Sequence, residues 1–79
     1  MNRDDIYKKL TEIFQEVFDR RDIVLNDDTN AGDVEGWDSL AYITIISSVE
    51  DEFSVRLPMK QVLSLQKVGE LVDLIEEKL

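Results

Sequence analysis

The sequence predicts an all-α fold: a four-helix bundle of three longer helices and one short third helix, with a long loop between the first two. Three stretches repeat apolar residues at helical spacing, and no stretch alternates them as a half-buried strand would. Turn-forming Asn, Asp, Gly and Thr residues gather between about residues 22 and 37, which places the long loop there. A chain of 79 residues fits one domain, residues 1–79.

The first helix is expected over about residues 3–19. Asn2 is a candidate N-cap, and Asp4 and Asp5 in the first turn suit the positive end of the helix dipole. The apolar residues of this segment recur every three or four positions and form one stripe: Ile6, Leu10, Ile13, Phe14, Val17 and Phe18.

The loop over about residues 22–37 is long for so small a domain, and such loops usually carry function or are fixed by their own side chains. Its large apolar residues are expected to pack on the core: Ile23, Leu25, Val34 and Trp37. For Trp37 a second interpretation stays open, in which the ring contacts a group bound nearby. Residues 26–30 suggest a calcium loop, but Ala31 stands where the invariant Gly should be and Trp37 where the bidentate Glu should be. No metal site is therefore predicted.

The second helix is expected over residues 39–53, with Asp38 as its N-cap. At about 100° per residue, one side of this helix collects the expected core residues Tyr42, Ile45, Ile46, Val49 and Phe53. Leu40 and Ile43 lie outside that stripe, and Ser47 projects between them. Large apolar residues in this position are either covered by the rest of the chain or offered to a partner, and both interpretations remain open.

Two shorter segments complete the fold. Pro58 is expected at the first position of a short helix that ends near Leu63. The last helix is expected over about residues 67–79, with Gly69 weakening its first turn by roughly 1 kcal/mol relative to Ala. Its apolar stripe comprises Val68, Leu71, Val72, Ile75 and Leu79.

The charge of the chain is strongly negative and concentrated in one segment. The net charge is -9, and the stretch between Arg21 and Arg56 holds nine acidic residues and no basic one. Such a chain is poorly suited to phosphate backbones or anionic lipid surfaces, so neither nucleic acid nor a membrane is expected as a partner. The charge either keeps the protein soluble or attracts partners with basic patches, and its concentration in one segment favours partners.

The chain contains no Cys and no His. This excludes disulfides, thiolate nucleophiles, the usual zinc sites and Ser-His catalytic pairs, so no catalytic residue and no enzyme activity are expected. The first five residues lack the apolar region of a signal peptide, and the longest apolar run is too short to span a membrane. A cytoplasmic, monomeric protein is the expectation.

The segment Gly36-Trp37-Asp38-Ser39-Leu40 places one hydroxyl at the first turn of the second helix. Exposed backbone N–H groups and the helix dipole would stabilise a phosphate ester there. The simpler interpretation is a capping pair, because Asp and Ser are both common at helix starts. No base lies near Ser39 in the sequence, so any modification of it would need a separate enzyme.

This segment, followed by the acidic end Glu50-Asp51-Glu52-Phe53 of the second helix, resembles the acyl carrier protein family in its stand-alone form. The similarity continues through residues 55–58 and into the last helix, so it covers essentially the whole chain as a single acyl carrier domain. The fold implied by the resemblance is the same four-helix bundle with a short third helix.

The resemblance implies a function for Ser39 and its neighbours. Ser39 would hold 4′-phosphopantetheine, transferred from coenzyme A by a phosphopantetheinyl transferase that Asp38 positions, with Leu40 beside the cofactor. The thiol of this group would carry acyl intermediates as thioesters to partner enzymes of fatty acid, polyketide or related biosynthesis. The apolar space between the second and third helices would shelter the acyl chain. The docking face for partners with basic patches would comprise Leu40, Ile43, Ser47, Glu50 and Asp51.

The sequence departs from the family pattern at three positions. Ala41 and Thr44 stand where many members have acids, which favours a specialised pathway over bulk fatty acid synthesis. Ser54 stands where a helix-ending Gly is usual, at a position that often needs φ > 0. The alternative function is an unmodified acidic helical protein-interaction module, in which Ser39 would be dispensable.

Overall fold

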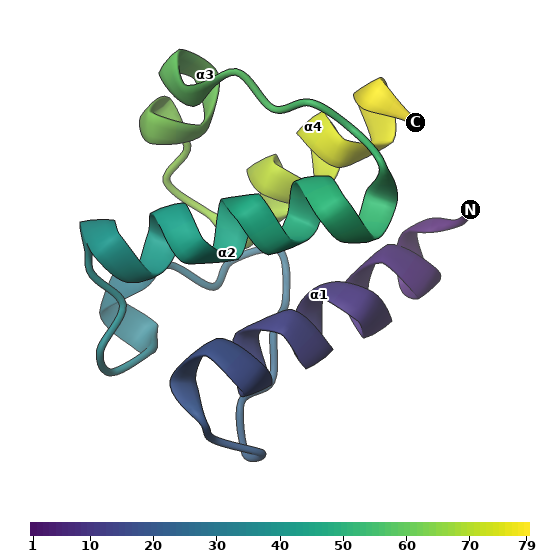
Figure 1. Ribbon diagram of the computed structural model, residues 1–79. Coiled ribbons are helices and arrows are strands. Elements are labelled where there is room, and N and C mark those ends of the chain that lie inside the picture. The colour runs from purple at the N-terminus through teal and green to yellow at the C-terminus, as the bar shows by residue number, and fades with distance from the viewer.

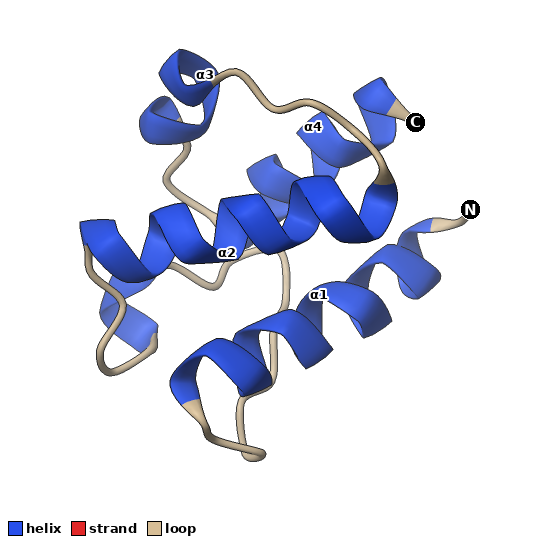
Figure 2. Ribbon diagram, in the orientation of Figure 1, coloured by secondary structure: helices blue, strands red, loops and turns tan.

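The computed structural model describes residues 1–79 and contains helices but no strand (Figures 1 and 2). The elements are α1 (Arg3–Phe18), a single 3₁₀ turn η1 (Ala31–Asp33), α2 (Ser39–Phe53), the short α3 (Met59–Ser64) and α4 (Val68–Lys78). In Figure 1, α1 runs alongside α2, α4 lies behind α2, and α3 stands beside the first half of α2. The all-α fold with a short third helix and a long first loop is confirmed.

The predicted bounds of α2 and the predicted start of α1 are confirmed, whereas the other helix ends differ from the expected ones by a residue, for reasons that the backbone shows. The first helix stops at Phe18, because Asp19 adopts a left-handed conformation and its N–H caps the preceding carbonyls. Pro58 is the N-cap of α3 rather than its first residue, since its ψ of 129° is extended. Lys67 likewise precedes α4, and Leu79 follows it. Asn2 and Asp38 are N-caps as predicted, with carboxamide and carboxylate oxygens accepting from Asp5 N and Ala41 N.

Eighteen buried apolar side chains form one core. The predicted core faces of α1 and α2 are confirmed, although Val17, Phe18 and Tyr42 are only partly buried. The loop residues Ile23, Leu25 and Val34 are buried as expected. The predicted stripe of the last helix is wrong at Leu79, which is 56 % exposed, and it omitted Leu74, which is buried. Leu79 lies beyond the last helical residue, so it does not continue the stripe.

The long loop is fastened to the start of α4. The backbone N–H of Val68 donates to Thr29 O at 2.8 Å, and that of Gly69 donates to Asp27 O at 3.1 Å. Thr29 is buried, and its hydroxyl accepts from Asn26 N at 2.9 Å. These contacts fix the position of residues 26–29 against the helix that follows Lys67.

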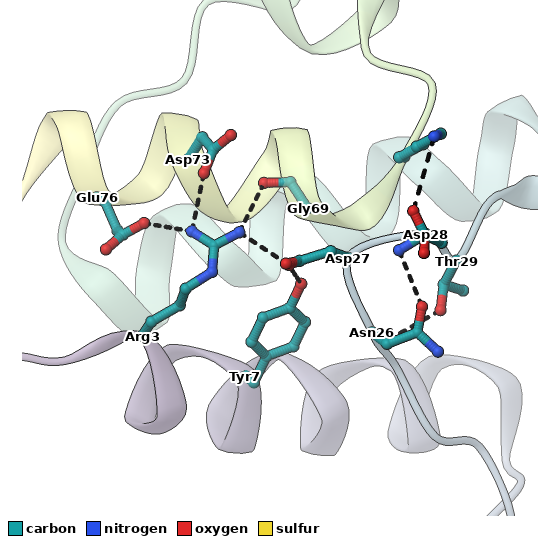
Figure 3. A network of polar contacts seen from close by, with 10 residues as sticks. Arg3, Tyr7, Asn26, Asp27, Asp28, Thr29, Gly69, Asp73 and Glu76 are labelled. Atoms are coloured by element: carbon teal, nitrogen blue, oxygen red, sulfur yellow. Dashed lines mark hydrogen bonds and ion pairs between the residues drawn. The ribbon is translucent and has the colours of Figure 1, made fainter.

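A network of side chains reinforces the same junction (Figure 3). The Arg3 guanidinium reaches from α1 to Asp27 in the loop at 2.8 Å and to Asp73 on α4 at 2.8 Å, and it also pairs with Glu76. The Tyr7 hydroxyl donates to the same Asp27 carboxylate. The network therefore joins three segments that are distant in the sequence.

No helix of this chain combines the length and the apolar character needed to cross a membrane.

Candidate functional site

The site begins where the long loop turns into α2. Gly36 has a φ of +89°, which favours Gly, and the chain then extends through Asp38 before the helix begins at Ser39. The Asp38 carboxylate accepts the N–H of Ala41 at 2.8 Å, and its backbone carbonyl accepts that of Tyr42 at 2.9 Å. The side chain of Asp38 thus caps the helix, and Ser39 is exposed at the first helical position.

Trp37 anchors this turn to the core. Its ring packs edge-on against Phe14 with centroids 5.1 Å apart and lies 5.7 Å from the ring of Tyr42. The anchoring role expected from the sequence is confirmed. The second interpretation, in which the Trp37 ring contacts a group bound nearby, stays open, because the ring also lines a cavity next to Ser39.

A cavity of about 310 Å³ opens beside Ser39. This volume lies at the small end of the range that is common for ligand pockets. The start of α2 forms one wall, and the end of α3 and the start of α4 form the other. Seven of the eleven residues that line the cavity are hydrophobic. The lining comprises Ala31, Trp37, Asp38, Ser39, Tyr42, Leu63, Leu65, Gln66, Lys67, Val68 and Leu71.

Tyr42 closes the space between α2 and α3. Its hydroxyl donates to the carbonyl of Val62 at 2.8 Å, and burial raises the pKa of Tyr42 to about 12. The phenol is therefore neutral and stays a donor at physiological pH. The sequence indicated Tyr42 only as a core residue, because a helical stripe does not reveal a hydrogen bond to another helix.

The proposed docking residues do not form a uniform surface. Leu40 is 74 % exposed and Ile43 is 44 % exposed, and Ser47 and Asp51 are also exposed. Glu50 differs, because it is half-buried and one carboxylate oxygen accepts the N–H of Leu57 at 2.8 Å.

Leu40 and Ile43 are therefore offered to the solvent in different degrees: the rest of the chain leaves most of Leu40 and a little under half of Ile43 uncovered. Two exposed apolar side chains on α3, Met59 and Leu63, were not among the expected surface residues. A six-residue helix is too short for a stripe to show which of its faces is buried. Leu63 borders the cavity beside Ser39, so the exposed apolar surface reaches the site from α3 as well as from α2.

Polar atoms of the long loop form hydrogen bonds within the loop itself. The Asn26 side-chain oxygen accepts from Asp28 N at 2.8 Å, and the Thr29 hydroxyl accepts from Asn26 N. No group of three or more Asp or Glu residues in the structure is arranged to hold a metal ion.

Comparison with known proteins gives consistent results. Residues 8–75 match the family model described as "Phosphopantetheine attachment site". The solution structure of a holo acyl carrier protein from Geobacter metallireducens is 38 % identical, with 91 % of this chain and 83 % of that chain covered and a TM-score of 0.84. The crystal structure of an acyl carrier protein from Thermotoga maritima is 26 % identical, with 99 % and 91 % covered and a TM-score of 0.85.

Proposed function

The chain belongs to the acyl carrier protein family of phosphopantetheine-binding proteins, and we propose that Ser39 is the residue to which its 4′-phosphopantetheine is attached. Members of this family are carriers rather than enzymes. The bound group supplies a thiol, which forms thioesters with acyl groups, and the chain itself contains no Cys that could do so.

The structure around Ser39 fits a phosphate ester. Ser39 is exposed, so a separate transferase can reach its hydroxyl. The first turn of α2 presents backbone N–H groups and the positive end of a helix dipole, which stabilise a phosphate. Asp38 uses its carboxylate to cap Ala41, which fixes the helix start and leaves Ser39 projecting from a defined position.

The cavity beside Ser39 supports the proposal independently. It is lined mainly by apolar side chains and adjoins the modified residue, so a group attached there has a sheltered surface within reach. The expected shelter lay between the second and third helices. The lining also includes Val68 and Leu71, so the wall opposite α2 is formed by α4 as well as by α3.

The docking face of the carrier is the exposed side of α2, comprising Leu40, Ile43, Ser47, Glu50 and Asp51. Its apolar centre and acidic end suit transient partners, because charge steers the encounter while a small contact area permits release. Asp51 contributes an exposed charge, whereas the carboxylate of Glu50 also accepts the N–H of Leu57.

We infer that the partners are a phosphopantetheinyl transferase and the acyl-transferring or synthase enzymes of a specialised fatty acid, polyketide or related pathway. Two features of this chain support a specialised pathway. The first half of α2 carries no acid after Asp38, and α3 carries Lys60 and no acid. Partners that require acids in these two places would bind this chain poorly.

The decisive experiment is intact mass after incubation with coenzyme A, Mg²⁺ and a broad-specificity phosphopantetheinyl transferase. The wild type is expected to gain one phosphopantetheine, and Ser39→Ala is expected to gain none while keeping its helical circular dichroism spectrum. Ser64→Ala is a matched control, because Ser64 lies on α3 and its hydroxyl donates to Gln61 O. It should gain the group as the wild type does.

A mass gain in Ser39→Ala would show that the group is attached to another residue. A folded wild type that gains no mass with several transferases would favour the unmodified interaction module instead.

A further inference from the structure

Lys67 is the only basic residue that lines the cavity beside Ser39. The nearest bases on either side of Ser39 in the sequence are Arg21 and Arg56, and neither lines the cavity. The only other charged residue in the lining is Asp38, whose carboxylate is held by Ala41 N. The fold therefore places one cation, from the residue that precedes α4, on the same cavity as a serine that the sequence surrounds with acids.

The backbone at Lys67 is firmly held. Its N–H donates to a carboxylate oxygen of Glu70 at 3.0 Å, and the two residues that follow donate to the loop carbonyls of Thr29 and Asp27. The root of the side chain is therefore fixed at the cavity, and only the flexible stem moves.

The ammonium group of Lys67, in contrast, is loosely held. Its closest carboxylate is that of Asp28 at 3.7 Å, near the outer limit of an ion pair, and the two side chains are 54 % and 88 % exposed. Exposed pairs of this kind contribute little to stability, so the ammonium is free to exchange partners. Lysine binds phosphate as a mobile point charge. A hydrogen bond between two charged groups is stronger than one between two neutral groups.

Resting on the proposed attachment at Ser39, we propose that Lys67 is a positioning residue that binds the phosphodiester joining the cofactor to this serine. In the unmodified chain its ammonium lies near Asp28. In the modified chain it pairs with the phosphodiester, which stays anionic at neutral pH and adds one negative charge close to Asp38. Lys67 thereby offsets the repulsion that this acidic segment imposes on its own cofactor and holds the first atoms of the group at the mouth of the cavity.

The test compares the unmodified and phosphopantetheine-loaded forms of the wild type, Lys67→Gln, Lys67→Arg and Lys60→Gln. Lys60→Gln is the matched control, because Lys60 is an exposed lysine on α3 that does not line the cavity. Loading is verified by intact mass. Phosphorus-31 NMR of the loaded forms and melting temperatures of both forms at low ionic strength are the readouts.

In Lys67→Gln the phosphodiester resonance is expected to shift from its wild-type position, and loading is expected to lower the melting temperature by a few degrees more than in the wild type. Lys67→Arg should restore both properties, and Lys60→Gln should leave the resonance unchanged. A role of Lys67 that is merely structural would change the melting temperatures of both forms equally and leave the resonance in place.

Loaded Lys67→Gln with the wild-type resonance and the wild-type change in melting temperature would overturn this inference alone. Absence of any mass gain in the wild type would overturn the attachment at Ser39 and this inference with it.

Discussion

Two residues other than Gly hold a left-handed backbone at helix ends, Asp19 after α1 and Ser54 after α2. The φ of Ser54 is 54°, so the positive φ expected from the family pattern is confirmed at this position. We predict that Ser54→Gly is neutral or raises the melting temperature by a few degrees, because Gly removes the steric strain but gives the unfolded chain more freedom. Thermal unfolding followed by circular dichroism measures the change.

Asp19→Gly is the matched comparison for Ser54→Gly. Its gain should be smaller, since the short polar side chain of Asp tolerates the left-handed region better than that of Ser. A clear fall in the melting temperature of Ser54→Gly would show that the serine makes a contribution that its backbone angle does not explain.

The fluorescence of Trp37 can report on the cavity beside Ser39, because its ring packs against the core residue Phe14 and also lines the cavity. We predict that attachment of phosphopantetheine changes the emission wavelength or intensity of this single tryptophan. Steady-state fluorescence before and after loading measures it, with Ser39→Ala treated in the same way as the control. An unchanged spectrum on a fully loaded sample would place the cofactor away from Trp37.

At the scale of elements, the contact between the long loop and α4 depends on a residue without a side chain. A Cβ at Gly69 would lie 2.8 Å from Asp27 O and 2.9 Å from Asp27 Cα, closer than real side chains approach. We predict that Gly69→Ala lowers the melting temperature by at least several degrees, because the backbone of the loop must move away. Thermal unfolding checks this, and Glu77→Ala, on the exposed side of the same helix, should cost little.

Gly69 also shows where reasoning from the sequence stops. Helix propensity alone indicates that Ala would stabilise this first turn, and the tertiary contact reverses the sign of the effect. The same holds for the Arg3 network, since nothing in the local sequence indicates that Arg3, Asp27 and Asp73 meet. The N-caps and core faces of α1 and α2 follow from local rules, whereas contacts between distant segments do not.

The network around Asp27 makes stability depend on pH. The hydrogen bond from Tyr7, and then that from Arg3, lower the pKa of Asp27 below its ordinary value. Folding therefore favours the ionised carboxylate, and this stabilisation is complete above the ordinary pKa of about 4 and is lost as the pH falls through the lower folded value. We predict that Asp27→Asn is less stable than the wild type at neutral pH and that this difference shrinks below about pH 4.

Melting temperatures of the wild type and Asp27→Asn from neutral to acidic pH test this dependence. Asp28→Asn is the neighbouring control, because Arg3 and Tyr7 hydrogen-bond to Asp27 and not to Asp28. A difference between the wild type and Asp27→Asn that stays constant across the acidic range would remove the titration of Asp27 as its cause.

At the scale of the whole molecule, the site consists of one part that is local in sequence and one part that is not. The start of α2 at Ser39 and its cap Asp38 agree with the prediction, because these two residues are adjacent in the chain and follow local rules. The opposite wall of the cavity, with Leu63, Leu65 and Lys67, comes from segments more than twenty residues away. Their approach to Ser39 depends on how α3 and α4 pack, which periodicity does not specify.

The excess of acids acts across the entire molecule. The protein extends 28 × 25 × 22 Å, and its net charge is -9. At about 0.01 M salt the Debye length is about 30 Å, so charges interact across the whole protein. At about 0.15 M salt it is about 8 Å, so only neighbouring charges interact strongly. We predict that this increase in salt raises the melting temperature, because the relief of general repulsion outweighs the weakening of the few exposed ion pairs.

Millimolar Mg²⁺ and Ca²⁺ should raise the melting temperature modestly and to the same degree. Screening by either ion, and its loose association with the nine acidic residues between Arg21 and Arg56, would relieve the repulsion within this stretch. Melting curves with NaCl, MgCl₂ and CaCl₂ at matched ionic strength separate the cases. A flat response to all three salts would show that repulsion does not limit stability. A large gain with Ca²⁺ alone would show specific binding of this ion instead of general screening.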